Sequence, residues 1–540
     1  MQTIDYNRLL DKIYGCWYGK CLGGAAGAPY EGIKKLLDVE DFREMLNPDL
    51  PNDDLDIQLL WIDVLKNNGF ELNSKILADA WLEKCWYPFS EYGYFMKNYE
   101  RGIDPPYSGI INNSFFKEGM GCAIRSEIWA VIGAGNPDLA VRYAYLDATL
   151  DHSDNAVYAE QFLAAAEAYA FICDDVEEII NKAMEYIPSN SKLASIIKMV
   201  EKLWKSGETW QSARKKVLNC CGHPDFTNVV QNMGFIIISI LYGAGDMSKT
   251  IEISLKCGYD TDCTCASSAA IIGVIKGFSN LGEVNKIIND RFVCGIDVEL
   301  GTDSIFELSK LTAYLSVIAP NYSIDIINTP FNAKKSRRFL PNMVLPTQEG
   351  LNREMAKIKP VKWNVYGPYF EQLDLPMSPK YPSPHGEGSV LPDIVCMVNN
   401  QVFLEKEYID ESKMEFEKDD FAGCIHAYED IVPIEDVIKT EGQLCCYAEA
   451  AFFSDEDKMI WIIIGNNDGF CVYVNNEKVI YRDEIRLWTP YNNFELVKLK
   501  KGENRIVLKL LRRTEKLVFS IGLRSYNGNH WHRSKWLTKY

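Results

Sequence analysis

The 540-residue sequence has no long hydrophobic run. Its most apolar stretch, residues 235–242, is far shorter than the roughly 18 residues that a membrane helix needs. The first residues, Met-Gln-Thr-Ile-Asp-Tyr, contain no basic region followed by an apolar run, so we expect no signal peptide. Internal repeats and low-complexity tracts are also missing, and we therefore expect neither a membrane protein nor a repeat array.

Positive charge is scarce as well. The chain has 57 lysines and arginines against 75 acidic residues, which gives a formal net charge of −18. General nucleic-acid binding requires a basic surface, so no nucleic-acid partner is expected, although a few local donors can still hold a phosphate-bearing ligand. No Gly-x-Ser-x-Gly elbow, P-loop or strand-linked GxGxxG is present, which argues against the enzyme classes built on those motifs.

The 16 cysteines do not form a recognisable framework. They are scattered, and the adjacent pairs at 220–221 and 445–446 are not CxxC metal knuckles. A chain of this size does not depend on disulfides, and cysteines inside apolar runs usually behave as small buried hydrophobes. We therefore expect a reducing compartment and a cytoplasmic location.

The hydrophobic period divides the chain into two parts. Residues 1–318 show helical spacing, most clearly over 57–65, 156–170 and 266–277, with further helices expected near 75–85, 175–205 and 246–257. Small residues line the 266–277 helix, so it can pack very closely as a central helix. Residues 319–358 are rich in proline and basic residues and are interpreted as a linker. This organisation predicts an all-α first domain.

From residue 359 the period shifts toward two. Residues 470–474, the turn Asn475-Asn476 and residues 478–481 predict a hairpin. Residues 496–499 and 506–510 predict a second hairpin, and the proline-rich stretch 376–392 a long loop. Residues 359–540 are therefore expected to form an antiparallel β-sandwich of the jelly-roll type.

Glycines at 15, 19, 23 and 27 recur every four residues and precede Glu31. They present one bare helical face that a backbone or a ligand can approach closely. One interpretation is a helix-packing seam followed by a solvated glutamate, and the other is a ligand site. The local sequence leaves both open.

Two further segments carry clustered oxygen ligands. Asn52, Asp53 and Asp54 begin a helix, where they could simply cap it and complement its dipole. Asp260 and Asp262 lie two positions apart in a loop before the small-residue helix. Neither cluster supplies enough ligands for a hard cation alone, but together they could hold one or two Mg²⁺ ions.

The order of these segments resembles the ADP-ribosylglycohydrolase family over roughly residues 10–280. That family has a glycine-spaced helix ending in Gly-Asp-Ala-x-Gly-x-Pro-x-Glu, a Thr-Asp-Asp helix start, a Gly-Asn-Gly-x-x-Met-Arg-like loop and a Gly-Gly-Asp-Thr-Asp-Thr segment. The corresponding stretches here are, in the same order, 23–31, 52–54, 119–125 and 258–262. The segment 151–154, which precedes an alanine-rich helix, lies between the last two and is part of the resemblance.

The resemblance implies an all-α, orthogonally packed fold with a binuclear Mg²⁺ centre that orients the ribose of ADP-ribose. Carried over, the metal ligands are Asn52, Asp53, Asp54, Asp260, Asp262 and Cys263. The implied catalytic residues are Glu31, as acid/base near the metal, with Asp54 and Asp260. The implied substrate-binding residues are Gly119, Gly121, Cys122 and His152. Cleavage of a glycosidic bond passes through an oxocarbenium-like state, which a positioned carboxylate and an activated water both favour.

Several positions depart from the family pattern. Asn52 replaces threonine, Gly24 replaces aspartate, Met120 replaces asparagine, and Cys263 replaces a threonine or serine ligand. A thiol is a poor partner for a hard ion, and Thr264 offers an alternative hydroxyl ligand after a one-residue shift. Three hypotheses follow: an Mg²⁺-dependent hydrolase of a ribosyl-type N- or O-glycosidic bond, a carbohydrate-active hydrolase of another glycoside, and a non-catalytic binder of ADP-ribose or a sugar.

The second half resembles the galactose-binding-like jelly rolls attached to many glycosidases, on segments 363–369, 467–476 and 501–506. That resemblance implies either a sugar-binding accessory domain or a structural cap through which the chain oligomerises. The expected partner of the whole protein is a small or protein-linked glycoside of the ADP-ribose kind.

Overall fold

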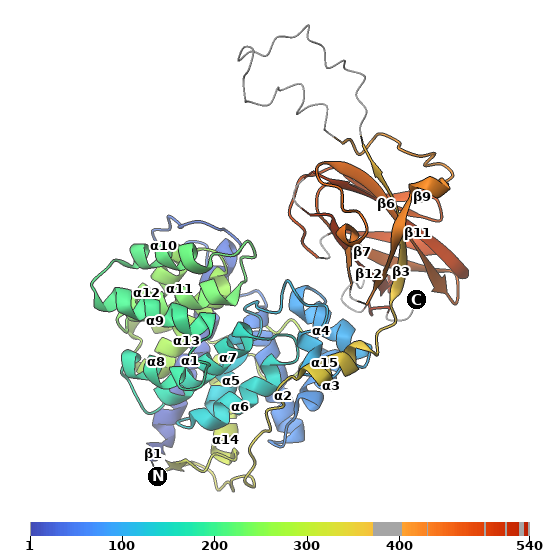
Figure 1. Cartoon of the computed structure of the whole chain (residues 1–540). Helices are drawn as coiled ribbons and strands as arrows, with labels where there is room; N and C mark the ends of the chain where they lie inside the picture. The colour runs from blue at the N-terminus through green and yellow to red at the C-terminus, as the bar shows by residue number, and fades with distance from the viewer. Residues whose placement is uncertain are drawn as a thin grey trace, which may run out of the picture. The chain divides into compact units, whose positions relative to one another are not determined.

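The computed structural model describes residues 2–370, 402–428, 430–490, 493–513, 516–528 and 534–537. The chain separates into two compact units, Met1–Leu351 and Asn352–Tyr540. Figure 1 shows a helical first unit and a second unit of strands. The expected loop at 376–392 lies outside the described residues, and the boundaries at 318 and 358 stay predictions.

The first unit is helical, as expected. Its helices, with one that crosses the unit boundary, are α1 (Tyr6–Gly27), α2 (Asp53–Asn68), α3 (Ser74–Lys84), α4 (Ser90–Glu100), α5 (Ser126–Ile132), α6 (Pro137–Ala148), α7 (Asn155–Ala170), α8 (Val176–Met184), α9 (Lys192–Lys205), α10 (Trp210–Cys221), α11 (Val229–Gly243), α12 (Met247–Cys257), α13 (Thr261–Lys276), α14 (Ile305–Ile318) and α15 (Gln348–Met355). None of the helices in the described part of the chain is long and apolar enough to cross a membrane.

The helices α1 and α13 pack with their backbones in contact near the centre of this unit (Figure 1). A Cβ built on any of the four glycines at 15, 19, 23 and 27 would lie 2.2–2.4 Å from a carbonyl oxygen of α13. The bare face of α1 is therefore a packing seam. It brings the end of α1 directly against the start of α13.

The segment 319–351 belongs to the first unit. Its strand β2 (Ile324–Ile327) pairs in parallel with β1 (Gln2–Asp5) at the N-terminus. Farther along, the carbonyl of Val344 accepts a hydrogen bond of 2.7 Å from the hydroxyl of Tyr145 on α6. These contacts fix the segment on the helical unit at both ends.

The helical stretch expected over 175–205 is two helices, α8 and α9. Pro188 lies between them and has no N–H to continue a helix. Ser191 then caps α9, because its hydroxyl accepts a hydrogen bond of 3.1 Å from the backbone N–H of Ala194.

The second unit consists of antiparallel strands, as expected. Its strands are β3 (Val361–Tyr369), β4 (Phe421–Ala427), β5 (Ile431–Pro433), β6 (Leu444–Ser454), β7 (Lys458–Asn466), β8 (Phe470–Val474), β9 (Glu477–Arg482), β10 (Asn493–Leu499), β11 (Gly502–Arg512) and β12 (Val518–Ser525). They form a four-stranded sheet in the order β10-β7-β12-β5 and a six-stranded sheet in the order β4-β3-β6-β11-β8-β9. Residues of both sheets, such as Trp363 and Ile462, share one buried core.

One of the two predicted hairpins is confirmed and the other is wrong. Strands β8 and β9 pair through the turn at Asn475 and Asn476, whose φ values are 51° and 69°. Strands β10 and β11 lie in different sheets, because β10 pairs with β7 while β11 pairs with β6 and β8. At the start of β11, the side chain of Asn504 makes two hydrogen bonds of 2.8 Å with the backbone of Lys500 and closes the turn at which the chain passes from one sheet to the other.

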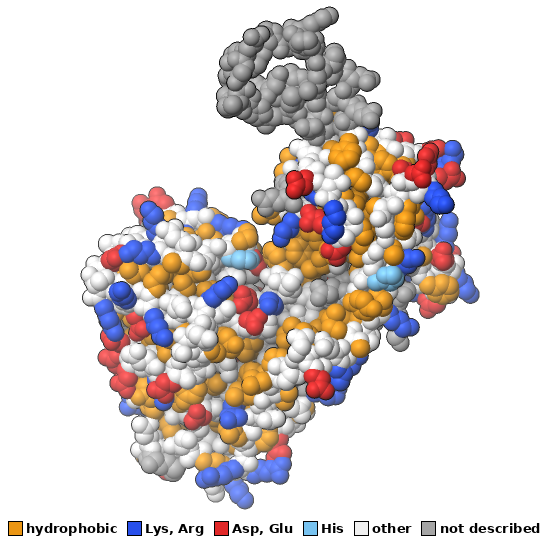
Figure 2. Space-filling model, viewed as in Figure 1, with side chains coloured by type: hydrophobic (Ala, Val, Ile, Leu, Met, Phe, Trp, Pro, Cys, Tyr) orange, Lys and Arg blue, Asp and Glu red, His pale blue; other side chains and the backbone are white. Residues whose placement is uncertain are grey.

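Figure 2 shows lysine, arginine, aspartate and glutamate side chains interspersed on the viewed face of each unit. The 15 cysteines of the described residues are all free, and most of them are buried or half-buried. These thiols therefore act as packing groups in the two cores.

Candidate metal centre

Three carboxylates gather where α1 ends and α13 begins. Glu31 follows a short 3-10 turn, η1 (Ala28–Tyr30), and lies beside Asp260 and Asp262. One oxygen from each of the three side chains lies within 4.8 Å of the others. Backbone hydrogen bonds between the Glu31 loop and Tyr259, 2.8 and 2.9 Å long, hold the two segments together. This set is called the oxygen group below.

A second set of possible ligands shares Asp262 with the oxygen group. It joins Asp262 to Asp54, in the first turn of α2, and to Cys263, in the first turn of α13, again with ligand atoms within 4.8 Å. Asp54 and Asp262 are buried, and Cys263 is half-buried. This set is called the mixed group below. The structure thus joins the acidic segments at 54 and 260–262, which are about 200 residues apart in the sequence.

Two side chains that the sequence brought into consideration make backbone contacts. The side-chain oxygen of Asn52 caps α2 by accepting a hydrogen bond of 2.8 Å from the N–H of Asp54. The hydroxyl of Thr264 donates to the carbonyl of Asp260, also at 2.8 Å.

The buried carboxylate of Asp260 fits a cation. Only 1% of the residue is exposed, and neither of its carboxylate oxygens accepts a hydrogen bond from the described residues. Burying a carboxylate without a partner is strongly unfavourable, and a hard cation such as Mg²⁺ supplies the missing partner. Burial, together with the charge of Asp262, raises the pKa of Asp260 well above its usual value.

Asp53 lies beside these groups but outside both of them. Its carboxylate accepts a hydrogen bond of 3.0 Å from the hydroxyl of Tyr92. Burial and the charge of Asp262 raise the pKa of Asp53 to about 7. Partial removal from water and the charges of Asp262 and Asp53 raise the pKa of Glu31 to about 8, although part of that side chain remains exposed. Glu31 and Asp53 therefore exchange protons near neutral pH in the metal-free protein.

Sequence analysis missed a buried cation at the centre. Nζ of Lys20, on α1, lies 3.2 Å from Asp54 and 2.9 Å from Glu127, and all three side chains are buried. It also donates to the carbonyl of Ile124 at 2.8 Å. Burial opposes this charge, but the two carboxylates raise the pKa of Lys20 and keep it protonated. A lysine among the glycines and apolar residues of α1 was the available signal.

The loop at residues 119–122, called the glycine loop below, packs on Glu91 of α4. The sequence did not indicate this carboxylate. A Cβ on Gly121 would lie 2.1 Å from Oε1 of Glu91, and one on Gly119 would lie 3.3 Å from it. The neighbouring Tyr92, which binds Asp53, is also 3.4 Å from the carbonyl of Gly121. The loop is therefore linked to the start of α2 through α4.

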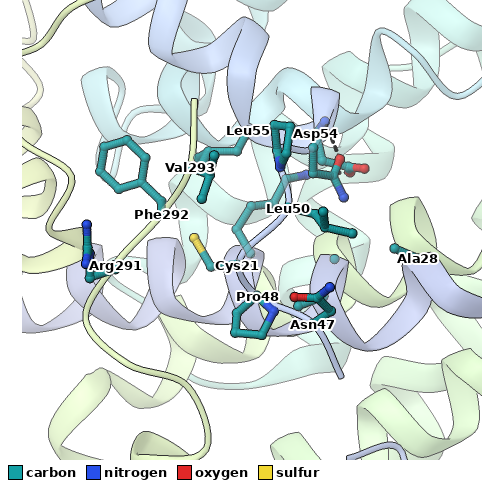
Figure 3. Close-up of a pocket in the computed structure, with 15 residues that line it drawn as sticks. Cys21, Ala28, Asn47, Pro48, Leu50, Asp54, Leu55, Arg291, Phe292 and Val293 are labelled. Carbon is teal, nitrogen blue, oxygen red and sulfur yellow. Dashed lines mark hydrogen bonds and ion pairs between the residues drawn. The ribbon is translucent and has the colours of Figure 1, made fainter. Parts of the chain in front are cut away.

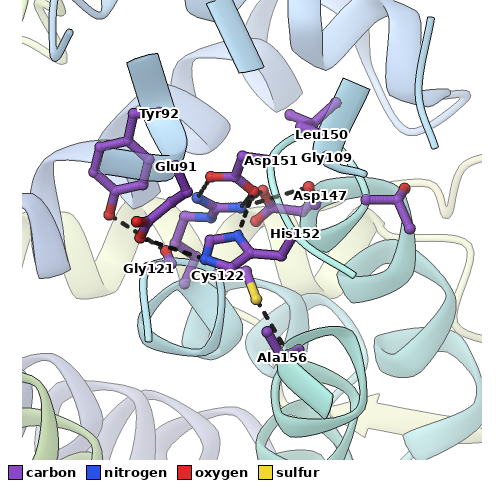
Figure 4. Close-up of polar contacts among 12 residues, drawn as sticks. Glu91, Tyr92, Gly109, Gly121, Cys122, Asp147, Leu150, Asp151, His152 and Ala156 are labelled. Atoms are coloured by element: carbon purple, nitrogen blue, oxygen red, sulfur yellow. Dashed lines mark hydrogen bonds and ion pairs between the residues drawn. The ribbon is translucent and has the colours of Figure 1, made fainter. Parts of the chain in front are cut away.

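His152 lies between two acidic side chains (Figure 4). Its Nδ1 is 2.7 Å from Asp151 and its Nε2 is 3.3 Å from Glu91. Burial disfavours the charged ring, but Asp151 and Cys122 raise the pKa of His152 well above its usual value. Asp151 in turn accepts two hydrogen bonds, of 2.8 and 2.9 Å, from the guanidinium of Arg125. Cys122 is buried and donates to a carbonyl of α7 at 3.3 Å.

A small pocket adjoins the mixed group on the side of α1 (Figure 3). Its volume is about 100 Å³, enough for a few water molecules and too little for a nucleotide sugar. It is lined by residues of α1, of segment 47–52, of the start of α2 and of segment 291–293. Asn52 and Asp54 belong to this lining, so water can reach the start of α2.

The sequence profile described as ADP-ribosylglycohydrolase matches residues 5–294. The chain therefore belongs to the ADP-ribosylglycohydrolase family, a hydrolytic family, and the expected resemblance is confirmed. The match covers both acidic segments, the glycine loop and His152.

Among solved structures, the chain is similar to an "ADP-ribosylglycohydrolase-related protein complex", with 20% identity and a TM-score of 0.39 over 57% of this chain and 98% of that one. It is also similar to a β-glucosidase from Kluyveromyces marxianus in complex with glucose, with 12% identity and a TM-score of 0.18 over 22% of this chain and 16% of that one. The PA14 domain of the MpAFP antifreeze protein matches with 12% identity and a TM-score of 0.16 over 19% of this chain and 54% of that one. These TM-scores are too low to inform the site. None of the curated proteins matches this sequence.

Proposed function

We propose that this protein is an Mg²⁺-dependent glycoside hydrolase that cleaves an N- or O-glycosidic bond at a ribosyl-type anomeric carbon. The observation that carries the proposal is the oxygen group, in which both oxygens of Asp260 are buried without a hydrogen-bond partner among the described residues. Three carboxylates within 4.8 Å of one another are the ligands that a hard divalent cation prefers.

Glu31, Asp260 and Asp262 would hold the Mg²⁺, which when bound would supply a water of lowered pKa and a contact for the hydroxyls of the sugar. Glu31 is the acid/base, because it is the exposed carboxylate of the oxygen group and can reach both water and substrate. Asp54 and Asp260 are held in fixed positions by burial and orient the reacting groups. Tyr92 holds Asp53 beside them.

The substrate class follows from family membership. ADP-ribosylglycohydrolases act on ADP-ribosylated substrates, so the proposed substrate is a small or protein-linked ADP-ribosyl conjugate. The loop at 119–122 would hold the ribose or its phosphates, with His152 and Glu91 fixing the loop from the protein side.

The proposal is tested by calorimetry on the metal-stripped protein, titrated first with Mg²⁺ and then with ADP-ribose. We expect Mg²⁺ to bind and ADP-ribose binding to depend on it. Asp260→Asn should abolish both, whereas Asp49→Asn, at an exposed position on the same unit, should change neither. Failure of the wild-type protein to bind Mg²⁺ would refute the proposal, and turnover of an ADP-ribosylated protein would extend it.

A second candidate, hydrolysis of a different glycoside, is favoured by Met120. Its side chain is 1% exposed and apolar, at a loop position where the family pattern has asparagine. A thioether is at most a weak acceptor, so it cannot replace the two donor hydrogens of an amide. Mg²⁺ binding without ADP-ribose binding, followed by turnover in a panel of other glycosides, would select this candidate.

A further inference from the structure

The oxygen group and the mixed group are chemically unequal although they share Asp262. The oxygen group offers three carboxylates, whereas the mixed group offers two carboxylates and the thiol of Cys263. Mg²⁺ prefers oxygen and binds sulfur poorly, while Zn²⁺ and Co²⁺ accept both. The same ion is therefore not expected to suit both groups.

Lys20 increases this difference. Its ammonium lies 3.2 Å from Asp54 and is held by Glu127 and by the carbonyl of Ile124, so it cannot move away. The charge of Asp54 is thus already compensated, and the net charge of the mixed group falls toward that of Asp262 alone. Any divalent cation therefore gains less electrostatic stabilisation there than in the oxygen group, and the bond to sulfur weighs more in the choice of ion.

The mixed group nevertheless has ligand atoms available for a cation. Asp54 is 1% exposed; its Oδ1 is ion-paired with Lys20, and its Oδ2 has no hydrogen-bond partner among the described residues. Cys263 is half-buried. Two carboxylates and one thiolate are three protein ligands, the number that catalytic zinc sites commonly supply before water or substrate completes the coordination.

We propose that the mixed group of Asp54, Asp262 and Cys263 is a separate site for a thiophilic divalent cation of the Zn²⁺ or Co²⁺ kind, while Mg²⁺ binds in the oxygen group. When the sulfur ligates the cation, the thiol proton passes to solvent. The inference rests on the proposed function, because it concerns the second cation position of the same centre. It makes the centre heterobimetallic.

The test uses Co²⁺ as a spectroscopic probe on the metal-stripped full-length protein. We expect one equivalent of Co²⁺ to produce a thiolate-to-metal charge-transfer band that persists when Mg²⁺ is saturating. Cys263→Ser should abolish the band. Cys220→Ser, which removes an exposed thiol far along the sequence, should leave it unchanged. A missing band, a band displaced by Mg²⁺ or a band that survives Cys263→Ser would overturn the inference.

A second variant separates this inference from the proposed function. Glu31→Gln removes a ligand of the oxygen group only, so it should weaken Mg²⁺ binding at least tenfold and leave the Co²⁺ band intact. Loss of the band in Glu31→Gln would contradict two distinct sites. Mg²⁺-dependent hydrolysis without a Co²⁺ band would refute the inference alone, and a Co²⁺ band without Mg²⁺ binding would refute the proposed function alone.

Discussion

Gly23 of α1 lies against the backbone of Cys265 on α13. A Cβ placed on Gly23 would be 2.3 Å from the carbonyl oxygen of Cys265 and 2.7 Å from the Cα of Ala266. Both neighbours are backbone atoms of a buried helix, which cannot move aside singly. The contact therefore sets the distance between the helices whose adjoining ends carry Glu31 and Asp260.

Gly23→Ala should lower the free energy of unfolding by about 3 kcal/mol, because overpacking outweighs the gain in helix propensity. The matched control is Gly24→Ala, whose added Cβ would meet side-chain atoms and no backbone within 4 Å, the nearest being the side-chain nitrogen of Asn52 at 3.0 Å. Urea denaturation of both variants checks this. Equal stability of the two variants would contradict a rigid seam.

The metal-free protein should lose stability as pH rises from about 6 to 9, because Glu31 and Asp53 hold protons in the folded state that they release when unfolded. Their pKa values of about 8 and 7 lie above the usual values, so folding binds protons and deprotonation weakens it. Melting temperatures in EDTA at several pH values measure the effect.

Added Mg²⁺ should flatten this pH dependence, since the cation replaces the protons. Glu31→Gln should remove the part of the slope that lies above neutral pH and serves as the control. If the melting temperature of the metal-free protein instead rose between about pH 6 and 9, Glu31 and Asp53 would not be holding protons in the folded state.

Asp151→Asn should destabilise the protein by about 3 kcal/mol at neutral pH, because it removes one of the two buried carboxylates, Asp151 and Asp147, that pair with the guanidinium of Arg125. Burial opposes ionisation of Asp151, but Arg125 and His152 lower its pKa to about 2. The control is Asp154→Asn, since Asp154 forms a solvent-exposed pair with Lys117. That change should cost less than about 1 kcal/mol. Chemical denaturation measures the free energy of unfolding of both variants. Comparable losses would contradict a stabilising buried pair between Asp151 and Arg125.

Glu411 of the second unit joins its loop to three strands, β6, β8 and β11. Its carboxylate accepts hydrogen bonds from Tyr447 (2.8 Å), Lys509 (2.6 Å) and Tyr473. Burial raises its pKa, but the hydrogen bonds from Lys509 and Tyr473 outweigh burial and lower it below the usual value. The stability that this group contributes is therefore present above pH ~4.3 and is lost as pH falls through the lower folded-state pKa.

Glu411→Gln should consequently destabilise the second unit by about 3 kcal/mol at neutral pH, since Lys509 would be buried without a counter-charge. Hydrogen exchange of β6 and β11 measures this locally. The neighbouring exposed change Asp410→Asn should have a much smaller effect. A difference between wild type and Glu411→Gln that does not shrink in acid would contradict the ionic role.

The parts of the site that the sequence predicted are those with a local signal. The four-residue glycine spacing predicted the close face of α1, and the acidic segments at 52–54 and 260–262 indicated the carboxylates that the structure brings together, Asp54, Asp260 and Asp262. Lys20 and Glu91 escaped notice, because their roles depend on partners 30 or more residues away in the sequence, such as Glu127 and Gly121. Which acidic side chains face one another is a property of tertiary packing.

The same limit applies to the second unit. Alternating apolar residues predicted β10 and β11 as strands, because that period depends only on one face being buried. It could not tell that the turn between them changes sheets, since Asn504 is tied to Lys500 by its side chain. A turn-rich sequence between two strands is compatible with a hairpin within one sheet and with a connection between two sheets.

The strand order of the second unit has a consequence for its synthesis. In the four-stranded sheet, β12 lies between β7 and β5, although it follows them by more than 50 and 80 residues. Until Val518–Ser525 has left the ribosome, β5 has no neighbour in that sheet and β7 is paired on one side only. A nascent chain halted before Val518 should therefore be recognised by chaperones or proteases as unfolded, while the helical unit is already complete.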